Sequence, residues 1–137
     1  MSYQEVLSVQ QTNEMLIFIV EDSKMYAMML EHQLQKATNH KYKRYLTGQE
    51  CLDDLHLNPE VIILDYNLPK MDGLEILQKI KKHNSRIHVI VLSAQQDLKI
   101  AINMFKEGAS DYIIKGTDSA AKLNQAINKL PKKLIRN

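Results

Sequence analysis

Near its middle, at residues 61–73, the chain reads VIILDYNLPKMDG. The first four residues are apolar and mostly β-branched, a composition typical of a strand buried on both faces of a parallel sheet. The run ends in an acid, Asp65, and the Leu68-Pro69 step beyond it turns the chain. This stretch predicts a buried strand over Val61–Asp65 that carries a carboxylate to the end of a sheet.

The same pattern, a strand followed by an amphipathic helix, repeats on both sides of this stretch. The strands are predicted at Met15–Val20, Tyr42–Leu46, Val61–Asp65, His88–Ser93 and Tyr112–Lys115. The helices are predicted at Ser23–Thr38, Gly48–Leu55, Leu74–His83, Asp97–Glu107 and Asp118–Leu130. Five strand–helix units predict an α/β fold: a doubly wound, five-stranded parallel sheet with five helices on its two faces.

Helical spacing predicts which helix residues face the sheet. The inward residues expected in the first helix are Tyr26, Met29, Leu30, Leu34 and Ala37, with Met25 and Met28 also packing. Those expected in the fourth helix are Ile100, Ala101, Met104 and Phe105. Lys43 and Arg44 place the strand at 42–46 on a sheet edge, because an edge strand tolerates charge.

Length and composition limit the class of protein. The chain has 137 residues, which fits one domain, predicted at 15–130 between a flexible leader at 1–14 and a short basic tail at 131–137. Lys and Arg number 18 and Asp and Glu 16, a balance that gives no reason to expect direct nucleic-acid binding. Four glycines, at positions 48, 73, 108 and 116, form neither a dinucleotide-binding nor a phosphate-binding glycine loop.

The compartment follows from the apolar runs and the cysteine count. The longest apolar run, Met15–Val20, is far shorter than the ~18 residues of a membrane span, so we expect no membrane association. The first fourteen residues lack the features of a secretory signal. Cys51 is the one cysteine and reads as an ordinary helix residue, so no internal disulfide forms and a reducing, cytoplasmic location is expected.

Polar groups end the predicted strands, and the carboxyl ends of parallel strands meet at one rim where α/β domains place their sites. These groups are Glu21, Asp22, Asp65, Ser93, Ala94 and Lys115. Three carboxylates and one ammonium sum to a charge of −2, which a divalent cation would neutralise. Oxygen ligands favour Mg²⁺, or Mn²⁺, and such an ion on an open rim meets phosphate. Asp65 is then a candidate nucleophile, with Lys115, the Ser93 hydroxyl and the Ala94 N–H stabilising phosphoryl oxygens.

Four motifs, in order, resemble the receiver domain of two-component response regulators. They are IFIVEDS (17–23), VIILDYNLPKMDG (61–73), VIVLSA (89–94) and GASDYIIK (108–115). The resemblance extends from about Leu16 to Leu130 and implies the flavodoxin-like receiver fold, with a single-domain, chemotaxis-regulator-like organisation. It also implies a signalling function in which a sensor histidine kinase or phosphotransfer protein phosphorylates Asp65.

The resemblance assigns roles to the remaining positions. The metal ligands it implies are Asp22 and Asp65 directly, Glu21 through water, and the backbone carbonyl of Asn67. Ser93 and Tyr112 match the switch residues; Ser93, Ala94 and Lys115 match the phosphate-binding positions. Asn67 and Gln95 match the positions that tune dephosphorylation. The output is expected at a protein-binding surface within residues 97–130, with exposed contacts at Ile102, Asn103 and Lys106, through a downstream partner or a homodimer.

Two positions depart from the family pattern. Glu21 stands where an Asp is commoner, and Gly116 stands where Pro usually follows the lysine in a cis peptide. Since a cis bond before a residue other than Pro costs about 2.5–4 kcal/mol, the loop 115–119 is expected to be built differently.

Three other readings stay open. The chain could be the receiver excised from a longer response regulator with an output domain, or a receiver kept only as a scaffold. It could also be a Mg²⁺-dependent phosphatase of haloacid-dehalogenase type. That motif asks for a second acid and then a Thr or Val at the positions of Asn67 and Pro69. On the leading reading the chain is not an enzyme beyond assisting its own phosphorylation and dephosphorylation.

Overall fold

One parallel sheet organises the molecule, for which a computed structural model describes residues 11–12, 14–131 and 133–134. Its strands lie in the order β3 (Lys41–Tyr45), β2 (Leu16–Val20), β4 (Val61–Asp65), β5 (His88–Ser93) and β6 (Asp111–Ile114). The helices are α2 (Lys24–Ala37), α3 (Gly48–Asp53), α4 (Gly73–His83), α5 (Leu98–Lys106) and α6 (Ser119–Asn128). This confirms the predicted doubly wound sheet with five helices, and it confirms β3 as an edge strand.

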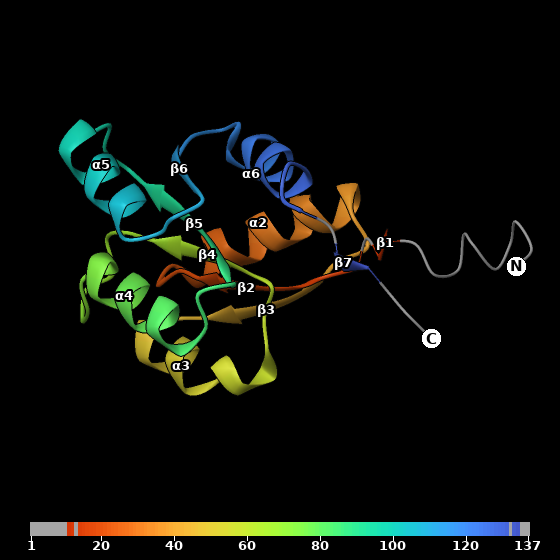
Figure 1. The fold of residues 1–137 in the computed structure, drawn as a ribbon. Helices are drawn as coiled ribbons and strands as arrows, with labels where there is room; N and C mark the ends of the chain where they lie inside the picture. Colours follow the sequence, from red (N-terminus) through yellow and green to blue (C-terminus); the bar gives the residue numbers. More distant parts are fainter. Residues whose placement is uncertain (1–10, 13, 132, 135–137) are drawn as a thin grey trace, which may run out of the picture.

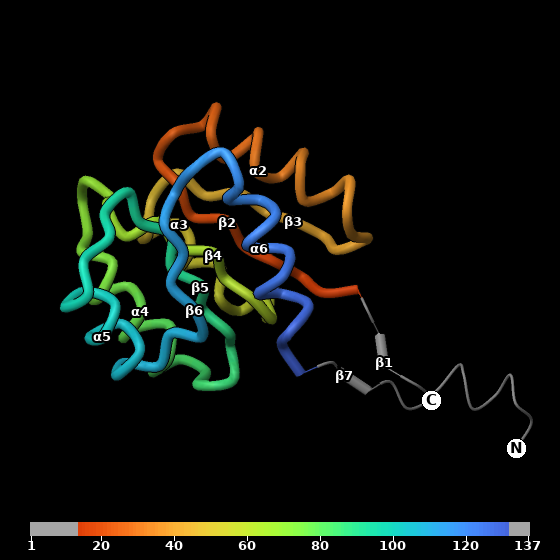
Figure 2. The backbone as a smooth tube through the Cα atoms, turned by 90° about the horizontal axis from the view of Figure 1, so that it is seen from above, coloured from red at the N-terminus to blue at the C-terminus, as the bar shows by residue number. Residues whose placement is uncertain are grey.

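The helices cover both faces of the sheet (Figure 1). Helices α2 and α6 lie side by side on one face, and α3, α4 and α5 cover the other, as Figure 2 shows from above. Alternate residues of each central strand enter the two cores. In β2, Phe18 and Val20 pack toward α3 and α4, whereas Ile17 and Ile19 pack toward α2 and α6. Burial on both faces explains why the central strands are continuous apolar runs.

Element boundaries follow local chemistry. The strands β4 and β5 occupy the predicted ranges, and the two edge strands each begin and end one residue earlier than predicted. Asp97 is the N-cap of α5 and not its first residue, because its Oδ1 accepts from the N–H groups of Lys99 and Ile100. The predicted helix at Gly48–Leu55 ends at Asp53, and a 3₁₀ helix, η1 (Leu55–Leu57), follows until Asn58 adopts a left-handed backbone with φ of 61°.

The predicted inward faces of two helices are partly wrong. The buried residues of α2 are Ala27, Leu30 and Leu34, a stripe with spacing of three and four, while Ala37 is exposed. The methionines Met25, Met28 and Met29 are also exposed, Met25 by 82%, so they are not packing residues. In α5 the buried residue is Met104; Ile100 and Ala101 are half-buried, and Phe105 is 48% exposed. Leu30, Leu34 and Met104 are buried as predicted. Both helices also carry apolar residues on other faces, so periodicity alone made the predicted inward faces too wide. Cys51 is buried in α3, as expected of a helix residue.

The predicted leader at 1–14 and tail at 131–137 are described only in part. A two-residue strand β1 (Gln11–Thr12) pairs in antiparallel fashion with β7 (Lys133–Leu134). Positions 1–10, 13, 132 and 135–137 lie outside the described residues. None of the helices in the described part of the chain combines the length and apolarity needed to cross a membrane.

Candidate functional site

Strand register brings the predicted site residues to one edge of the sheet. Val20 of β2 is opposite Leu64 of β4, so that the next residues along, Glu21 and Asp65, end adjacent strands. Asp65 is in turn opposite Leu92 of β5. At the far side of β5, Ser93 is opposite Ile114 and its carbonyl accepts from the Lys115 N–H at 2.8 Å. The carboxyl edge of the sheet therefore collects these side chains, as the strand ends predict.

Three carboxylates form the centre of the site. One oxygen from each of Glu21, Asp22 and Asp65 lies within 4.8 Å of the others. Glu21 and Asp65 are buried, at 3% and 2% exposure, and Asp22 is exposed. Burial raises the pKa of Glu21 to about 7, helped by the neighbouring carboxyls of Asp22 and Asp65 and opposed by Lys115 and the Ser23 N–H. The site thus concentrates negative charge, and a bound cation would stabilise the ionised form of its carboxyls.

Lys115 supplies one positive charge to this cluster. Its Nζ lies 2.6 Å from Glu21 Oε1 and 3.2 Å from Asp65 Oδ2. Burial alone would lower the pKa of Lys115, but the hydrogen bond to Glu21 and the charge of Asp65 outweigh it, so the pKa lies above its ordinary value. The sequence placed Lys115 at the rim but gave no signal for its direct pairing with Glu21.

Backbone N–H groups hold the two buried carboxylates in place. Glu21 Oε2 accepts from the Ser23 N–H at 3.0 Å, and Asp65 Oδ1 accepts from the Asn67 N–H at 3.0 Å. Each acid therefore has one oxygen on a backbone amide and the other on Lys115. These bonds fix both buried side chains, whereas the neighbouring Asp22 carboxylate is exposed.

The donor set fits a hard divalent cation. The cluster offers only carboxylate oxygens, without His or Cys, which suits Mg²⁺ or Mn²⁺ and disfavours zinc. Its net charge after pairing with Lys115 is still negative. The side chains that would hold such an ion are those of Asp22, Asp65 and Glu21. The resemblance adds the backbone carbonyl oxygen of Asn67 as a further ligand.

The end of β5 connects to Tyr112 through the following loop. Ser93 is fully buried, and its Oγ accepts from the Gln95 N–H at 3.1 Å. The half-buried Tyr112 donates from its hydroxyl to the Gln95 carbonyl at 2.9 Å. Ala94, Gln95 and Asn67 are exposed at the mouth of the site. The two predicted switch residues thus hold the same loop residue, a link that the sequence did not reveal.

A buried serine holds the loop after Lys115. The Gly116 N–H donates to Ser119 Oγ at 2.8 Å, and the Ser119 hydroxyl donates to the Gly116 carbonyl at 2.8 Å. Among the described residues no peptide bond is cis, so the bond between Lys115 and Gly116 is trans. The loop is therefore closed by side-chain hydrogen bonds, which agrees with the expectation that it differs from the common family pattern.

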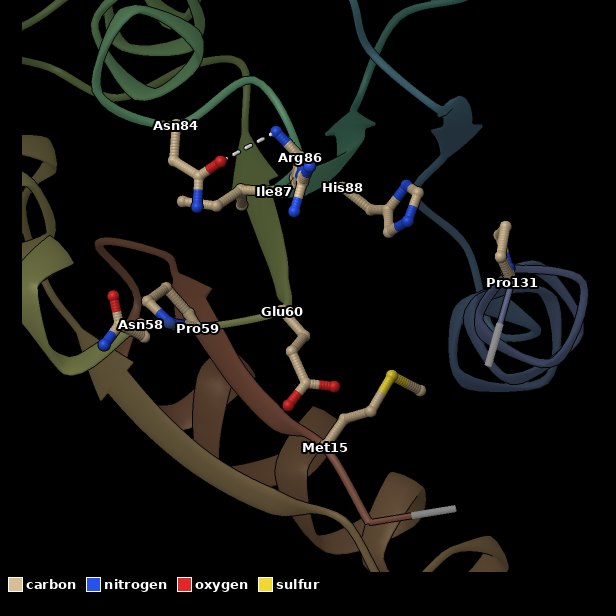
Figure 3. A pocket seen from close by; sticks show the side chains of 9 residues that line it. All are labelled: Met15, Asn58, Pro59, Glu60, Asn84, Arg86, Ile87, His88 and Pro131. Atoms are coloured by element: carbon tan, nitrogen blue, oxygen red, sulfur yellow. Dashed lines mark hydrogen bonds between the residues drawn. The ribbon is translucent and has the colours of Figure 1, made fainter. Parts of the chain in front are cut away.

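Two cavities differ in their distance from the cluster. One, of about 510 Å³, is lined by residues that precede β2, β4 and β5, and Figure 3 shows Asn58, Glu60 and Arg86 around it. Because it lies at the amino ends of the strands, it is remote from the carboxylates. The other, of about 170 Å³, lies beside Asp22 and is lined mainly by apolar groups that include Leu68 and Met71. Of the three carboxylates, Asp22 is the one that lines the smaller cavity.

The fold and the site together define a doubly wound α/β domain with an acidic, metal-compatible pocket at the carboxyl edge of its sheet. The chain belongs to the response regulator receiver domain family, whose model matches residues 17–128. This confirms the resemblance seen in the sequence motifs.

Three similar proteins illustrate the range of the family. The chain is 34% identical over 104 residues to the DNA-binding transcriptional regulator NtrC of Klebsiella pneumoniae, covering 75% of this chain and 22% of that protein. It is 28% identical to the chemotaxis protein CheY of Thermotoga maritima, covering 85% of this chain and 97% of that one. The Mn²⁺-bound form of response regulator Rcp1 has a TM-score of 0.73 at 25% identity, covering 87% and 99% of the two chains. The chain thus spans about a fifth of the NtrC relative and almost all of the CheY relative.

Proposed function

We propose that this chain is a phosphorylation-controlled signalling domain that accepts a phosphoryl group on Asp65 from a sensor histidine kinase or phosphotransfer protein. One observation carries the proposal: the buried Asp65 carboxylate lies within 4.8 Å of two further carboxylates and 3.2 Å from the Lys115 ammonium. The Mn²⁺-bound relative Rcp1 supports Mg²⁺ or Mn²⁺ as the cofactor. The haloacid-dehalogenase reading is not favoured, because the family match spans the whole domain.

The chemistry needs a nucleophile, charge stabilisation and a receptive leaving group. An Asp65 oxygen attacks the phosphorus of a phosphohistidine; the new O–P bond forms as the P–N bond breaks, and the imidazole nitrogen keeps the electron pair and takes a proton. A bound Mg²⁺ would neutralise charge on the phosphoryl oxygens. Lys115 donates to one of these oxygens and the Ser93 hydroxyl and Ala94 N–H to others. Water later hydrolyses the acyl phosphate and regenerates Asp65, and we propose no enzymatic activity beyond these steps.

Incubation with a small acyl phosphate tests the proposal without a cognate kinase. Intact-mass analysis is expected to show one phosphoryl adduct when Mg²⁺ or Mn²⁺ is present. Chelation of the metal is expected to abolish it. Equal adduct formation in EDTA, or no adduct under any condition, contradicts the proposed function.

Metal affinity is expected to fall more in Asp22→Ala than in Glu21→Ala. Both Glu21 oxygens already accept hydrogen bonds, from Lys115 and the Ser23 N–H, whereas Asp22 is exposed. Loss of an indirect ligand costs on the order of tenfold to a hundredfold in affinity, and loss of a direct ligand costs more. Titration of the metal-free protein with Mg²⁺ measures both, with Asp53→Ala on α3 as an exposed carboxylate control. Equal losses would show that Glu21 also coordinates directly.

The output is expected at a protein-binding surface on α5, β6 and α6, and Ser93→Ala is expected to disconnect it from phosphorylation. The hydroxyl must leave Gln95 to donate to the phosphoryl group, and Tyr112 then loses its fixed acceptor on that same loop residue. NMR of the phosphorylated variant should show shifts around Asp65 and none across residues 97–130. Ser93→Thr, which keeps a hydroxyl, serves as the control. Full shifts in Ser93→Ala would show that the hydroxyl does not transmit the signal.

The lifetime of the phosphoryl group is expected to depend on Asn67 and Gln95. Both side chains are exposed at the mouth of the site, where an amide can orient the attacking water. Leucine at either position should slow hydrolysis by shielding the acyl phosphate. Following the adduct by mass after removal of the donor measures this lifetime. If neither variant changes it, other groups position the water.

The finer assignments also belong to this proposal. The single buried Cys51 supports a reducing, cytoplasmic location. The partners are a phosphodonor protein and a downstream protein or second copy that binds residues 97–130, with no direct role for nucleic acid. Because the NtrC relative is much longer than the matched region, the reading frame around these residues distinguishes a single-domain regulator from the receiver of a longer one.

A further inference from the structure

An aromatic ring contacts the Lys115 ammonium. Tyr26 lies in the first turn of α2, half-buried, with its ring centroid 5.0 Å from Lys115 Nζ. This is within the range of a cation–π contact, in which the negative face of the ring attracts the ammonium. Tyr26 is the first residue of the stripe predicted to face inward on α2, and its packing explains its burial. Packing does not explain its position over the lysine.

The ring differs in kind from the other partners of the ammonium. An ammonium has three N–H donors, and two of them are directed at Glu21 and Asp65. Both of these acids belong to the cluster that fits a metal ion, so a bound cation competes with Lys115 for them. Within the described part of the chain, the Tyr26 ring is the one partner of the ammonium that is not a candidate metal ligand. It can hold Lys115 in place when the carboxylates are engaged elsewhere.

One short segment sets both sides of this arrangement. Ser23 donates its N–H to Glu21 Oε2 at 3.0 Å, and its Oγ accepts from the Tyr26 N–H at 3.2 Å as the N-cap of α2. The same residue therefore fixes the carboxylate and the start of the helix that carries the ring. Lys115 follows β6, the edge strand of the sheet that lies beyond β4 and β5 from β2.

The hydroxyl of Tyr26 does not account for the residue. Its oxygen is buried and has no hydrogen-bond partner among the described residues. A buried hydroxyl without a partner opposes folding, so the ring is the useful part of this side chain. Phenylalanine at this position would keep the ring and remove the unsatisfied atom.

We propose that Tyr26 is a positioning residue for the phosphoryl site: its ring holds the Lys115 ammonium over Asp65 when the neighbouring carboxylates bind metal. This inference rests on the proposed function for its consequence, although the ring contact itself does not. A cation–π contact of ordinary strength corresponds to a roughly two- to fivefold change in an equilibrium constant. Tyr26→Leu therefore weakens phosphoryl binding by about this factor through Lys115.

Beryllofluoride, which mimics a phosphoryl group on a carboxylate, provides the binding measurement. Its affinity is determined at saturating Mg²⁺ for the wild-type chain, Tyr26→Leu and Tyr26→Phe, with Met29→Leu as a control on the exposed face of the same helix. The loss is expected in Tyr26→Leu, with rescue in Tyr26→Phe. Mg²⁺ affinity alone should stay the same in all four. The loss should vanish when Lys115→Ala is the background, because the ring then has no ammonium to hold.

Four results overturn the proposal, three from the binding measurements and one from NMR. Equal losses in the Leu and Phe variants would assign the effect to the hydroxyl, and a loss that persists in Lys115→Ala would show that the ring acts through another group. A fall in Mg²⁺ affinity would indicate a general disturbance of the site.

NMR distinguishes a failure of the ring contact from a failure of the proposed function. An upfield ring-current shift of the Lys115 Hε protons reports the contact in the unphosphorylated chain. If the shift is present but the wild-type chain binds no beryllofluoride, the proposed function fails; if the shift is absent, the contact fails.

Discussion

Asp65→Asn is expected to abolish phosphorylation by an acyl phosphate. An amide oxygen is a far weaker nucleophile than a carboxylate, and the substitution also removes one of the three carboxylates that fit the metal. The Asn67 N–H can still donate to the new amide oxygen, so the loop geometry should persist. Intact-mass analysis after a fixed incubation measures the adduct, and circular dichroism verifies that the variant is folded.

Asp53→Asn is the matched control for this experiment. Asp53 is an exposed carboxylate at the end of α3 that accepts a hydrogen bond from Gln49. It is not one of the three carboxylates of the cluster. The Asp53→Asn variant should therefore be phosphorylated on Asp65 to the same extent as the wild-type chain. A phosphoryl adduct that forms equally in Asp65→Asn would assign the acceptor to another residue, and Asp22 would be the first alternative to test by peptide mapping.

Phe18→Ala is expected to lower the free energy of unfolding by about 3–5 kcal/mol, the range for truncating a fully buried aromatic side chain. Phe18 is 0% exposed at the centre of β2, with its ring 4.7 Å from that of Tyr45. Phe105→Ala provides a direct comparison, because this second phenylalanine is 48% exposed on α5. Its removal should change the free energy by about 0.5 kcal/mol or less. Urea unfolding followed by circular dichroism measures both.

The comparison also tests which face of α5 packs against the sheet. If Phe105→Ala lowered the free energy of unfolding as much as Phe18→Ala, the result would indicate that Phe105 is buried in the core and that Met104 is at the surface. A small loss together with a large one for Met104→Ala supports the buried face as the structure has it. Unequal slopes of the unfolding transitions would indicate a change in the unfolded state as well.

The strands and the rim of the site could be predicted from the sequence because each depends on short, local patterns. A continuous β-branched run such as that of β4 has few alternatives in a chain of this length, and the acid at its end fixes Asp65 at the rim. Parallel order then places Glu21 and Lys115 at the same edge. The place of the three acids and the lysine at one rim therefore follows from the sequence alone.

The wrong helix faces and the missed contacts have a different origin. The nine residues of α5 include Leu98, Ile102 and Phe105 on one side and Ile100 and Met104 on another, so its pattern supports two faces. Only the place of α5 against the sheet decides between them. Pairs such as Lys115 with Glu21, or Tyr112 with Gln95, depend on side-chain directions across strands, and no local spacing encodes those.

The ion pair between Lys115 and Glu21 joins residues 94 positions apart. The chain emerges from the ribosome amino end first, so all three carboxylates appear well before the lysine that pairs with two of them. In the interval the acidic cluster lacks the Lys115 ammonium, which pairs with Glu21 and Asp65 in the folded chain. Docking of β6 then has two effects: it completes the sheet edge, and it brings Lys115 to two of the three carboxylates, which partly offsets their repulsion. We therefore expect docking of the last strand to stabilise the native state late in folding. On incomplete chains, we expect divalent cations to take the place of the Lys115 charge.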